Sequence, residues 1–474
     1  MSESKKKLVQ KMDWYTLALM AFSGVWGFGN VINGFYWYDG LKAIIPWILM
    51  FSLYFVPYSL MVGELGSAFK NESGGVSSWI LKTIGPRMAF YAGWTYWVVH
   101  MPYISQKPNA VLIASSWAIF RDNRISQMNT TLMALVCLVI FLVAMLLARR
   151  GISIIKKLGA IAGSSMFIMS ILYIILMMAA PAISGGQTLS IDWSVSTFTP
   201  NFDLKFFTSF SILVFAVGGC EKFSPYVNKM KDPAKGFSKG MIAMAVMVCI
   251  CAILGTIAMG MMFDSNNIPE DLMTNGAYYA FAKLGGYYHV GDLFVVLYAI
   301  TNLIGQFSVM IISIDAPLLM LLGSADKDFI PESMFKQNKF GAYTNGHKLV
   351  FIIVGLLIVI PAFGIKSVDT LVQWLVKVNS VCMPLRYLWV FVAYVALKKV
   401  AEKFPAEYHF TTKKGLGIFF GIWCFIVTAL ACISGIYSED KFQMTLNILT
   451  PLVLLALGLI MPMMARRNKN KTAA

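Results

Sequence analysis

Charged residues are scarce in this sequence of 474 residues. Asp, Glu, Lys and Arg make up only 13% of the chain, about half of their usual share in soluble domains. Hydrophobic residues make up 58%, and the mean hydropathy is +0.68. A soluble fold could not bury this much apolar surface. The composition therefore excludes a soluble protein and predicts an integral membrane protein.

Cysteine and histidine are also few, with seven and four residues. The cysteines lie inside apolar segments without the spacing of metal ligands, which predicts packing residues instead of disulfides or a metal site. The segment "GFSKG" at 236–240 formally matches the nucleophile motif G-x-S-x-G, but the four histidines fall in unrelated segments. The motif H-E-x-x-H does not occur either. We therefore expect no enzyme, no cofactor and no metal ion.

About twelve apolar stretches are long enough to cross a membrane as helices. They run near residues 14–36, 41–63, 88–118, 128–148, 155–180, 204–228, 239–263, 289–322, 347–364, 369–397, 415–437 and 442–464. The sequence therefore predicts an all-α integral membrane fold with about twelve transmembrane helices.

Most of the 39 Lys and Arg residues fall in alternate loops between the predicted spans. They gather in residues 5–11, 70–87, 149–157, 222–239, 327–348, 398–414 and 466–471. Because Lys and Arg near helix ends accumulate on the cytoplasmic side, we expect both tails, residues 1–12 and 466–474, in the cytoplasm. The net charge of +16 then reflects topology in a cytoplasmic membrane and affinity for anionic lipid, and no nucleic acid is expected as a partner.

Two predicted spans contain glycines where a transmembrane helix would otherwise continue. The first span holds Gly24-Val-Trp-Gly-Phe-Gly29, and the sixth holds Gly218 and Gly219. Non-helical backbone at membrane depth is tolerated only where it is buried or lines a watery cavity. Two broken helices at corresponding places in the two halves predict a transporter, in which a half-helix end binds a substrate carboxylate and free carbonyls bind an amine. The alternative is that these glycines only allow close helix packing.

Ionisable residues also lie inside the predicted spans, where they are rare and usually face a cavity. Lys107, Lys377 and Asp315 are the candidates for charges in such a cavity. Glu221 lies in the broken sixth span just after its two glycines, and a buried carboxylate can hold either a proton or a substrate ammonium. We therefore predict that Glu221 couples proton and amine binding. The alternative for each residue is a structural ion pair, or a side chain that reaches the membrane surface.

The third span is polar for a membrane interior, with "HMPYISQKPN" at 100–109. His100, Tyr103 and Lys107 are three and four residues apart, so they share one face of a helix. We expect this face to form a wall of the central cavity, with Tyr103 in contact with the substrate. The alternative is a proline-kinked helix whose freed backbone groups are satisfied by these side chains.

Three stretches resemble the amino acid–polyamine–organocation superfamily, and within it the glutamate/γ-aminobutyrate antiporter-like branch. They are "GELGSAFKNESGGVSSW" at 63–79, "FAVGGCEKFSPYVNKMKDPAKGFSKG" at 215–240, and "DAPLLMLLGSADKDFIPESMFKQNKFG" at 315–341. The resemblance implies a five-plus-five inverted-repeat fold of the leucine-transporter type, with broken helices 1 and 6. Residues 13–180 would form the first repeat, 204–398 the second, and 414–465 helices 11 and 12.

The resemblance also assigns site residues. Gly27, Phe28 and Gly29 stand where relatives have G-S-G, beside Trp26, and Gly218 and Gly219 belong to the sixth-helix signature. Phe215 stands where relatives place an aromatic residue that closes over the substrate. In some relatives the acid that matches Glu221 responds to protonation.

The resemblance implies transport of an amino acid or amine by alternating access. Aromatic residues around the breaks favour an antiporter that exchanges tyrosine, or another bulky amino acid, for its decarboxylated amine. A proton-coupled symporter and a glutamate/γ-aminobutyrate antiporter stay open as alternatives, as does an amino-acid sensor without flux. The oligomeric state cannot be read from the sequence.

Overall fold

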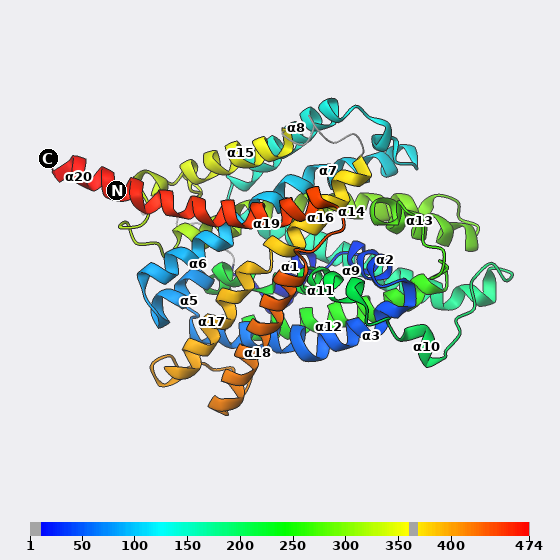
Figure 1. The fold of residues 1–474 in the computed structure, drawn as a ribbon, viewed down its shortest axis with the longest axis horizontal. Coiled ribbons are helices and arrows are strands. Elements are labelled where there is room, and N and C mark those ends of the chain that lie inside the picture. The colour runs from blue at the N-terminus through cyan, green and yellow to red at the C-terminus, as the bar shows by residue number, and fades with distance from the viewer. Residues whose placement is uncertain (1–10, 360–367, 474) are drawn as a thin grey trace, which may run out of the picture.

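The protein is described from a computed structural model, which places residues 11–359 and 368–473. Within these residues every extended regular element is a helix, and only two isolated β-bridges occur. The predicted all-α fold is confirmed (Figure 1).

The helices up to residue 183 are α1 (Trp14–Val25), α2 (Gly29–Trp37), α3 (Ile44–Met50), α4 (Val56–Ala68), α5 (Val76–Thr83), α6 (Pro86–Val98), α7 (His100–Phe120), α8 (Thr130–Ala148) and α9 (Ile152–Ile183). After them come α10 (Val195–Phe198), α11 (Leu204–Val217), η4 (Cys220–Lys229), α12 (Pro233–Gly260), α13 (Leu272–Tyr287), α14 (Leu293–Leu322), α15 (Thr344–Val359), α16 (Val368–Cys382) and α17 (Leu385–Lys399). The last helices are α18 (Lys414–Ser434), α19 (Lys441–Ala456) and α20 (Ile460–Ala473).

Ten helical stretches in the described part of the chain are long and apolar enough to cross a membrane. They correspond to ten of the twelve predicted spans. The predicted third span is α6 followed by α7, and α7 has 21 residues but is rich in polar side chains. The predicted ninth span is α15, whose described part is an apolar helix of 16 residues.

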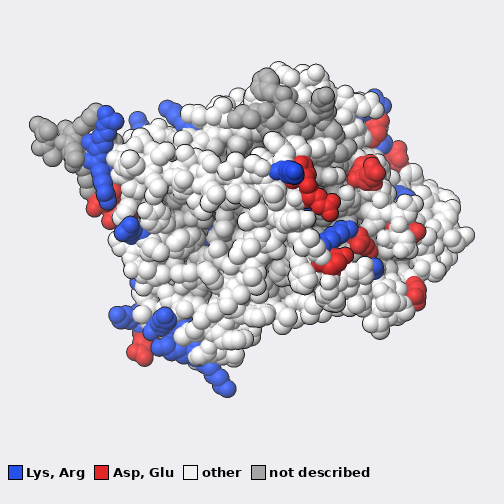
Figure 2. Space-filling view, in the orientation of Figure 1, with Lys and Arg blue, Asp and Glu red and all other residues white. Residues whose placement is uncertain are grey.

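The two ends of the helical bundle differ in charge. Figure 1 shows α20 and the loop between α17 and α18 at one end, and α10 and α13 at the other. On the face shown in Figure 2, Lys and Arg dominate the α20 end, whereas both signs of charge occur at the α13 end. An excess of Lys and Arg is typical of cytoplasmic loops. The cytoplasmic location of the α20 end stays a prediction that this distribution supports.

Small residues let the inner helices approach closely. Helix α1 packs against α9 and α12, and α14 packs against α7 and α9. A Cβ atom at Gly163 would lie 1.9 Å from the carbonyl oxygen of Leu19, so α9 can contact the α1 backbone only with glycine there. This packing of small residues is typical of helices in membranes, and it fixes α1 in the centre of the molecule.

The first and sixth predicted spans are broken, as expected. Helix α1 ends at Val25 and α2 begins at Gly29, while α11 ends at Val217 and η4 begins at Cys220. Gly219 has a φ of +118°, a conformation that side chains with a Cβ rarely adopt. The sequence "GG" therefore allows the second break.

The predicted repeats end near the ends of α9 at Ile183 and of α17 at Lys399, and the division of the chain into two repeats stays a prediction. The symmetry between the repeats stays a prediction. The predicted N-terminal tail lies mostly outside the described residues, and the predicted C-terminal tail continues α20 as far as Ala473.

Candidate functional site

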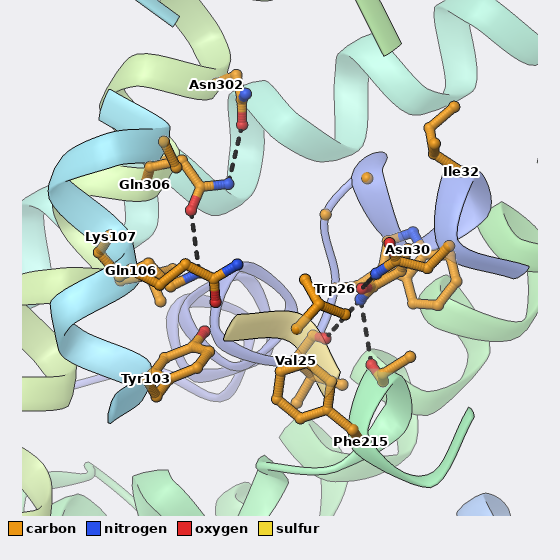
Figure 3. Close-up of a pocket in the computed structure, with 18 of the residues that line it drawn as sticks. Val25, Trp26, Asn30, Ile32, Tyr103, Gln106, Lys107, Phe215, Asn302 and Gln306 are labelled. Carbon is orange, nitrogen blue, oxygen red and sulfur yellow. Dashed lines mark hydrogen bonds between the residues drawn. The ribbon is translucent and has the colours of Figure 1, made fainter. Parts of the chain in front are cut away.

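A cavity of about 210 Å³ lies where the two broken helices meet (Figure 3). Its walls come from the breaks, from α7 and α14, and from α16 and α17, and it extends to α13. The polar and charged side chains that line it are Ser23, Asn30, Asn33, Tyr103, Gln106, Lys107, Asn109, Lys222, Thr274, Tyr278, Tyr298, Asn302, Gln306, Arg386 and Tyr387. No Asp or Glu is among its lining residues.

Asn30, in the first turn of α2, connects the two breaks. Its amide nitrogen donates hydrogen bonds to the carbonyl oxygen of Val25 at 3.2 Å and to that of Ala216 at 3.1 Å. Figure 3 shows both bonds beside the cavity. Val25 is the last residue of α1, and Ala216 lies in the last turn of α11. Because the last carbonyls of a helix have no partner in the helix, they are free to accept other donors.

Seven of the predicted site residues line the cavity. They are Trp26, Gly27, Gly29, Tyr103, Lys107, Phe215 and Gly218. The rings of Tyr103 and Phe215 meet edge to face, with their centroids 6.2 Å apart. A Cβ atom at Gly218 would lie 2.0 Å from the Tyr387 ring, so this glycine leaves room for a side chain of the wall.

Two other predicted residues of the breaks do not line the cavity. Phe28 points into an aromatic cluster, where its ring centroid lies 4.7 Å from that of Tyr173 and 5.2 Å from that of Phe281. Phe28 therefore packs the protein interior, and its predicted contact with substrate stays a prediction. Gly219 also lies behind the cavity wall, where a Cβ atom would be 3.2 Å from Arg386 Nη2.

Glu221 is fully buried and does not line the cavity either. Its carboxylate accepts hydrogen bonds from the hydroxyls of Tyr58 and, at 2.6 Å, of Tyr96. Its Oε1 lies 3.4 Å from Arg386 Nε, in an ion pair in which both side chains are at most 1% exposed. The Arg386 guanidinium already neutralises this carboxylate in this conformation, and the expected direct contact between Glu221 and a substrate amine stays a prediction. Its part in coupling stays a prediction.

His100 completes this buried network. Its Nδ1 lies 2.7 Å from the carbonyl oxygen of Tyr96, so Nδ1 is the nitrogen that carries hydrogen and donates. Its Nε2 is left to accept from Arg386 Nη1. His100 is thus a neutral partner of Arg386, and it ties α7 to α17.

The predicted cavity charges Asp315 and Lys377 lie elsewhere. Asp315 accepts a hydrogen bond from the Tyr226 hydroxyl at 3.0 Å, where η4 meets α14. The ammonium of Lys377 lies 4.8 Å from the ring centroid of Trp37. Neither residue lines the cavity, and each has a partner outside its lining.

Two lysines of the cavity share one aromatic ring. The ammonium groups of Lys107 and Lys222 lie 4.3 Å and 5.1 Å from the ring centroid of Tyr103. Lys107 donates to Gln306 at 3.0 Å, and Lys222 donates to Ser313 at 3.3 Å. Within the described residues neither lysine has a carboxylate within 4.0 Å.

A chain of amides continues from Lys107 along α14. Gln306 accepts from Lys107 and donates to Asn302 at 3.1 Å, and Asn302 donates to the Tyr278 hydroxyl at 2.8 Å (Figure 3 shows the first two bonds). Each amide accepts on one side and donates on the other, which fixes their orientation. One wall of the cavity is therefore polar from its centre to α13.

Backbone pairing joins the segment before α1 to the end of η4. The Met12 amide donates to the Lys229 carbonyl, and the Lys231 amide donates to the Met12 carbonyl, both at 2.9 Å. Lys231 Nζ also lies 3.0 Å from Asp13 Oδ1. The segment before α1 thus holds the end of η4, and the cavity reaches α13 but not this end.

Sequence reasoning missed several residues of the site. Asn30 was not singled out, because asparagine in an otherwise apolar span has no distinctive spacing. Lys222 was counted with the cytoplasmic loops, since it follows the predicted break and precedes four more basic residues. The signal that could have placed Lys222 is its position directly after Glu221, which was itself predicted to lie inside the membrane.

Comparisons with known proteins agree with this architecture. The sequence profile of the amino acid permease family matches residues 12–460. The chain is 46% identical to the aspartate/glutamate permease AcaP of Lactococcus lactis subsp. cremoris, over 98% of this chain and 97% of that protein. It is 23% identical to the inner membrane transporter YjeM of Escherichia coli, over 82% of each chain. It is 22% identical to the probable agmatine/putrescine antiporter AguD of Lactococcus lactis subsp. lactis, over 80% of this chain and 78% of that protein.

The chain belongs to the amino acid permease family. It is a multi-pass membrane transporter of the leucine-transporter-type fold, and not an enzyme.

Proposed function

We propose that this protein transports acidic amino acids, aspartate or glutamate, across the cytoplasmic membrane by alternating access. The observation that carries this proposal is the pair of ammonium groups of Lys107 and Lys222 over the Tyr103 ring. An unpaired charge in a membrane interior is costly and marks a functional site. A substrate carboxylate would supply the missing negative charge.

The electrostatics of the cavity favour an anionic substrate over a cationic one. Lys107, Lys222 and Arg386 line it, and in the part of the chain that the structure describes the carboxylate paired with Arg386, that of Glu221, is not among the lining residues. A substrate with a second ammonium, such as a diamine, would add like charge to two unpaired lysines. The proposal therefore replaces our expectation of an amino acid/amine antiporter for tyrosine with the alternative of an acidic substrate.

The aromatic residues no longer favour a bulky substrate. Phe28 is packed against Tyr173 and Phe281, and the Trp26 ring is only 1% exposed and packs on Trp47. Tyr103 and Phe215 remain at the cavity, and the ammonium groups of two lysines lie over the Tyr103 ring. A cation over an aromatic face is attracted electrostatically, so Tyr103 positions the lysines.

The α-amino and α-carboxylate groups have separate partners at the breaks. Helix α2 begins at Gly29, and its positive end faces the cavity through Gly27 and Gly29. A helix N-terminus is suited to a carboxylate. The carbonyl ends of α1 and α11 are suited to an ammonium. A dicarboxylic amino acid thus fits three sites: the α2 end, the carbonyls and the two lysines.

Exchange of labelled substrate by the purified protein in liposomes tests the proposal. Vesicles loaded with unlabelled aspartate should take up labelled aspartate and glutamate, and excess tyrosine, histidine or agmatine outside should not inhibit this uptake. Uptake that needs internal substrate indicates antiport, whereas uptake into vesicles without internal substrate, driven by a proton gradient, indicates symport. Selective uptake of tyrosine or agmatine would contradict the acidic substrate, and binding without flux would indicate a sensor.

A further inference from the structure

The side-chain amide of Asn30 lies between two backbone carbonyls that end separate half-helices. Its nitrogen is 3.2 Å from Val25 O and 3.1 Å from Ala216 O. Both hydrogens of the amide are therefore used, one on each carbonyl. The amide oxygen accepts from Asn33 at 3.5 Å, which leaves the nitrogen facing the break.

These two carbonyls are the acceptors that an amino acid's ammonium would need. They belong to the C-terminal ends of α1 and α11, where the helix dipoles concentrate negative charge. Val25 and Ala216 both line the cavity, although Ala216 lies 186 residues after Asn30 in the sequence. An ammonium offers three donors in a compact head, and it would replace the two donors of the amide.

We infer that the Asn30 amide occupies the ammonium subsite in this conformation and must leave it when an amino acid binds. Asn30 is half-buried and lines the cavity, so its side chain can turn away without unpacking the core. The amide stabilises the two breaks until a charged ammonium takes over both carbonyls. This inference rests on the proposed function for the identity of the substrate, and on the observed bonds for the role of Asn30.

Competition of this kind gives a specific signature. An amino acid must displace the amide, whereas the same acid without its amino group has no need to. Removing the amide should therefore strengthen binding of the amino acid and leave the deaminated acid unchanged. If Asn30 instead bound the substrate directly, its removal would weaken binding of the amino acid.

The test compares aspartate with succinate, which keeps both carboxylates and lacks the ammonium. Inhibition constants of the two are measured against exchange of labelled aspartate in liposomes, for the unaltered protein and for Asn30→Ala. We expect Asn30→Ala to bind aspartate about 3- to 10-fold more tightly, since the displaced amide exchanges its two hydrogen bonds for bonds to water and the net cost is modest. The inhibition constant of succinate for Asn30→Ala should stay within about twofold of its value for the unaltered protein.

Two further variants separate competition from loss of fold. Asn30→Asp has the same shape but cannot donate to the carbonyls and can pair with an ammonium, so it should also raise the preference for aspartate over succinate. Asn123→Ala removes an asparagine that is not among the lining residues of the cavity and donates a hydrogen bond to Asn275. The aspartate-to-succinate ratio should be unchanged in that control.

Weaker aspartate binding in both Asn30 variants would overturn the inference. An equal loss of affinity for aspartate and for succinate would overturn it as well. If the unaltered protein exchanges neither aspartate nor glutamate, the proposed function fails separately. The same comparison is then made with the amino acid that it does exchange and the deaminated form of that amino acid.

Discussion

Glu221 Oε1 lies 3.4 Å from Arg386 Nε, in an ion pair that joins η4 to α17 away from water. Removing one partner of a buried ion pair leaves an uncompensated charge, which typically costs about 3–5 kcal/mol. We therefore expect Glu221→Gln to lower the thermal unfolding temperature of the purified protein strongly. Replacing both partners, with Glu221→Gln and Arg386→Met, should recover part of the loss. An unfolding temperature unchanged in the single variant would show that the pair is not buried as described.

Lys107 and Lys222 should determine the preference for a charged side chain. We expect Lys222→Met to weaken binding of aspartate about 10- to 100-fold, the value of a charge-assisted hydrogen bond. Binding of asparagine should be affected much less. Lys283→Met is the matched control, because Lys283 also lies over an aromatic ring, 4.3 Å from the centroid of Phe263, but does not line the cavity. The readout is inhibition of labelled aspartate exchange by each amino acid. An equal loss of affinity for aspartate and for asparagine would show that Lys222 does not recognise the side-chain charge.

Gly218 and Gly29 both line the cavity but differ in the space around them. A Cβ atom at Gly218 would lie 2.0 Å from the Tyr387 ring, whereas one at Gly29 would meet nothing within 4 Å. Gly218→Ala should therefore displace Tyr387, lower the unfolding temperature and reduce exchange, since overpacking typically costs about 1–3 kcal/mol. Gly29→Ala should leave the unfolding temperature within about one degree. Equal stability of the two variants would contradict the close contact at Gly218.

Asp13 and Lys231 fasten the segment before α1 to the end of η4. The hydrogen bond from Lys231 holds the pKa of Asp13 below its usual value of 3.8. The ion pair is therefore intact above this value, and it is lost only as the pH falls through the lowered pKa. Asp13→Asn should open this end of the pathway more often, by about 2- to 5-fold, since the pair is partly exposed.

The opening can be measured by alkylation of a cysteine introduced at the buried Val227, with the unaltered protein as the control for its native cysteines. At each pH the rate should be higher in the Asp13→Asn background, and the ratio of the two rates should stay constant from pH 8 to 5, because the pH dependence of the thiolate is the same in both backgrounds. A rate unaffected by Asp13→Asn would show that backbone pairing alone keeps this end closed.

Local composition predicts the breaks and the spans well. Gly218 and Gly219 mark the end of α11 correctly, because a positive φ at Gly219 depends on the residue itself. The polar third span also predicts a cavity wall, since Tyr103 and Lys107 share one helix face and both line the cavity.

Partners from distant segments could not be predicted in the same way. Glu221 was recognised as a charge inside a span, but its pairing with Arg386 depends on how α17 packs against η4, 165 residues away in sequence. The same is true of Asn30, whose two carbonyls belong to different halves of the chain. The orientation of Phe28 also depends on a distant segment, because its ring packs against Tyr173 of α9, and its predicted contact with substrate stays a prediction.

The central claim is that two unpaired lysines in the cavity bind the side-chain carboxylate of an acidic amino acid. The most direct measurement is the dissociation constant of the purified protein for aspartate and for asparagine, which differ only in that group. The account predicts that aspartate binds at least about 10-fold more tightly, the value of one charge-assisted contact. Equal affinity, or tighter binding of asparagine, would contradict it.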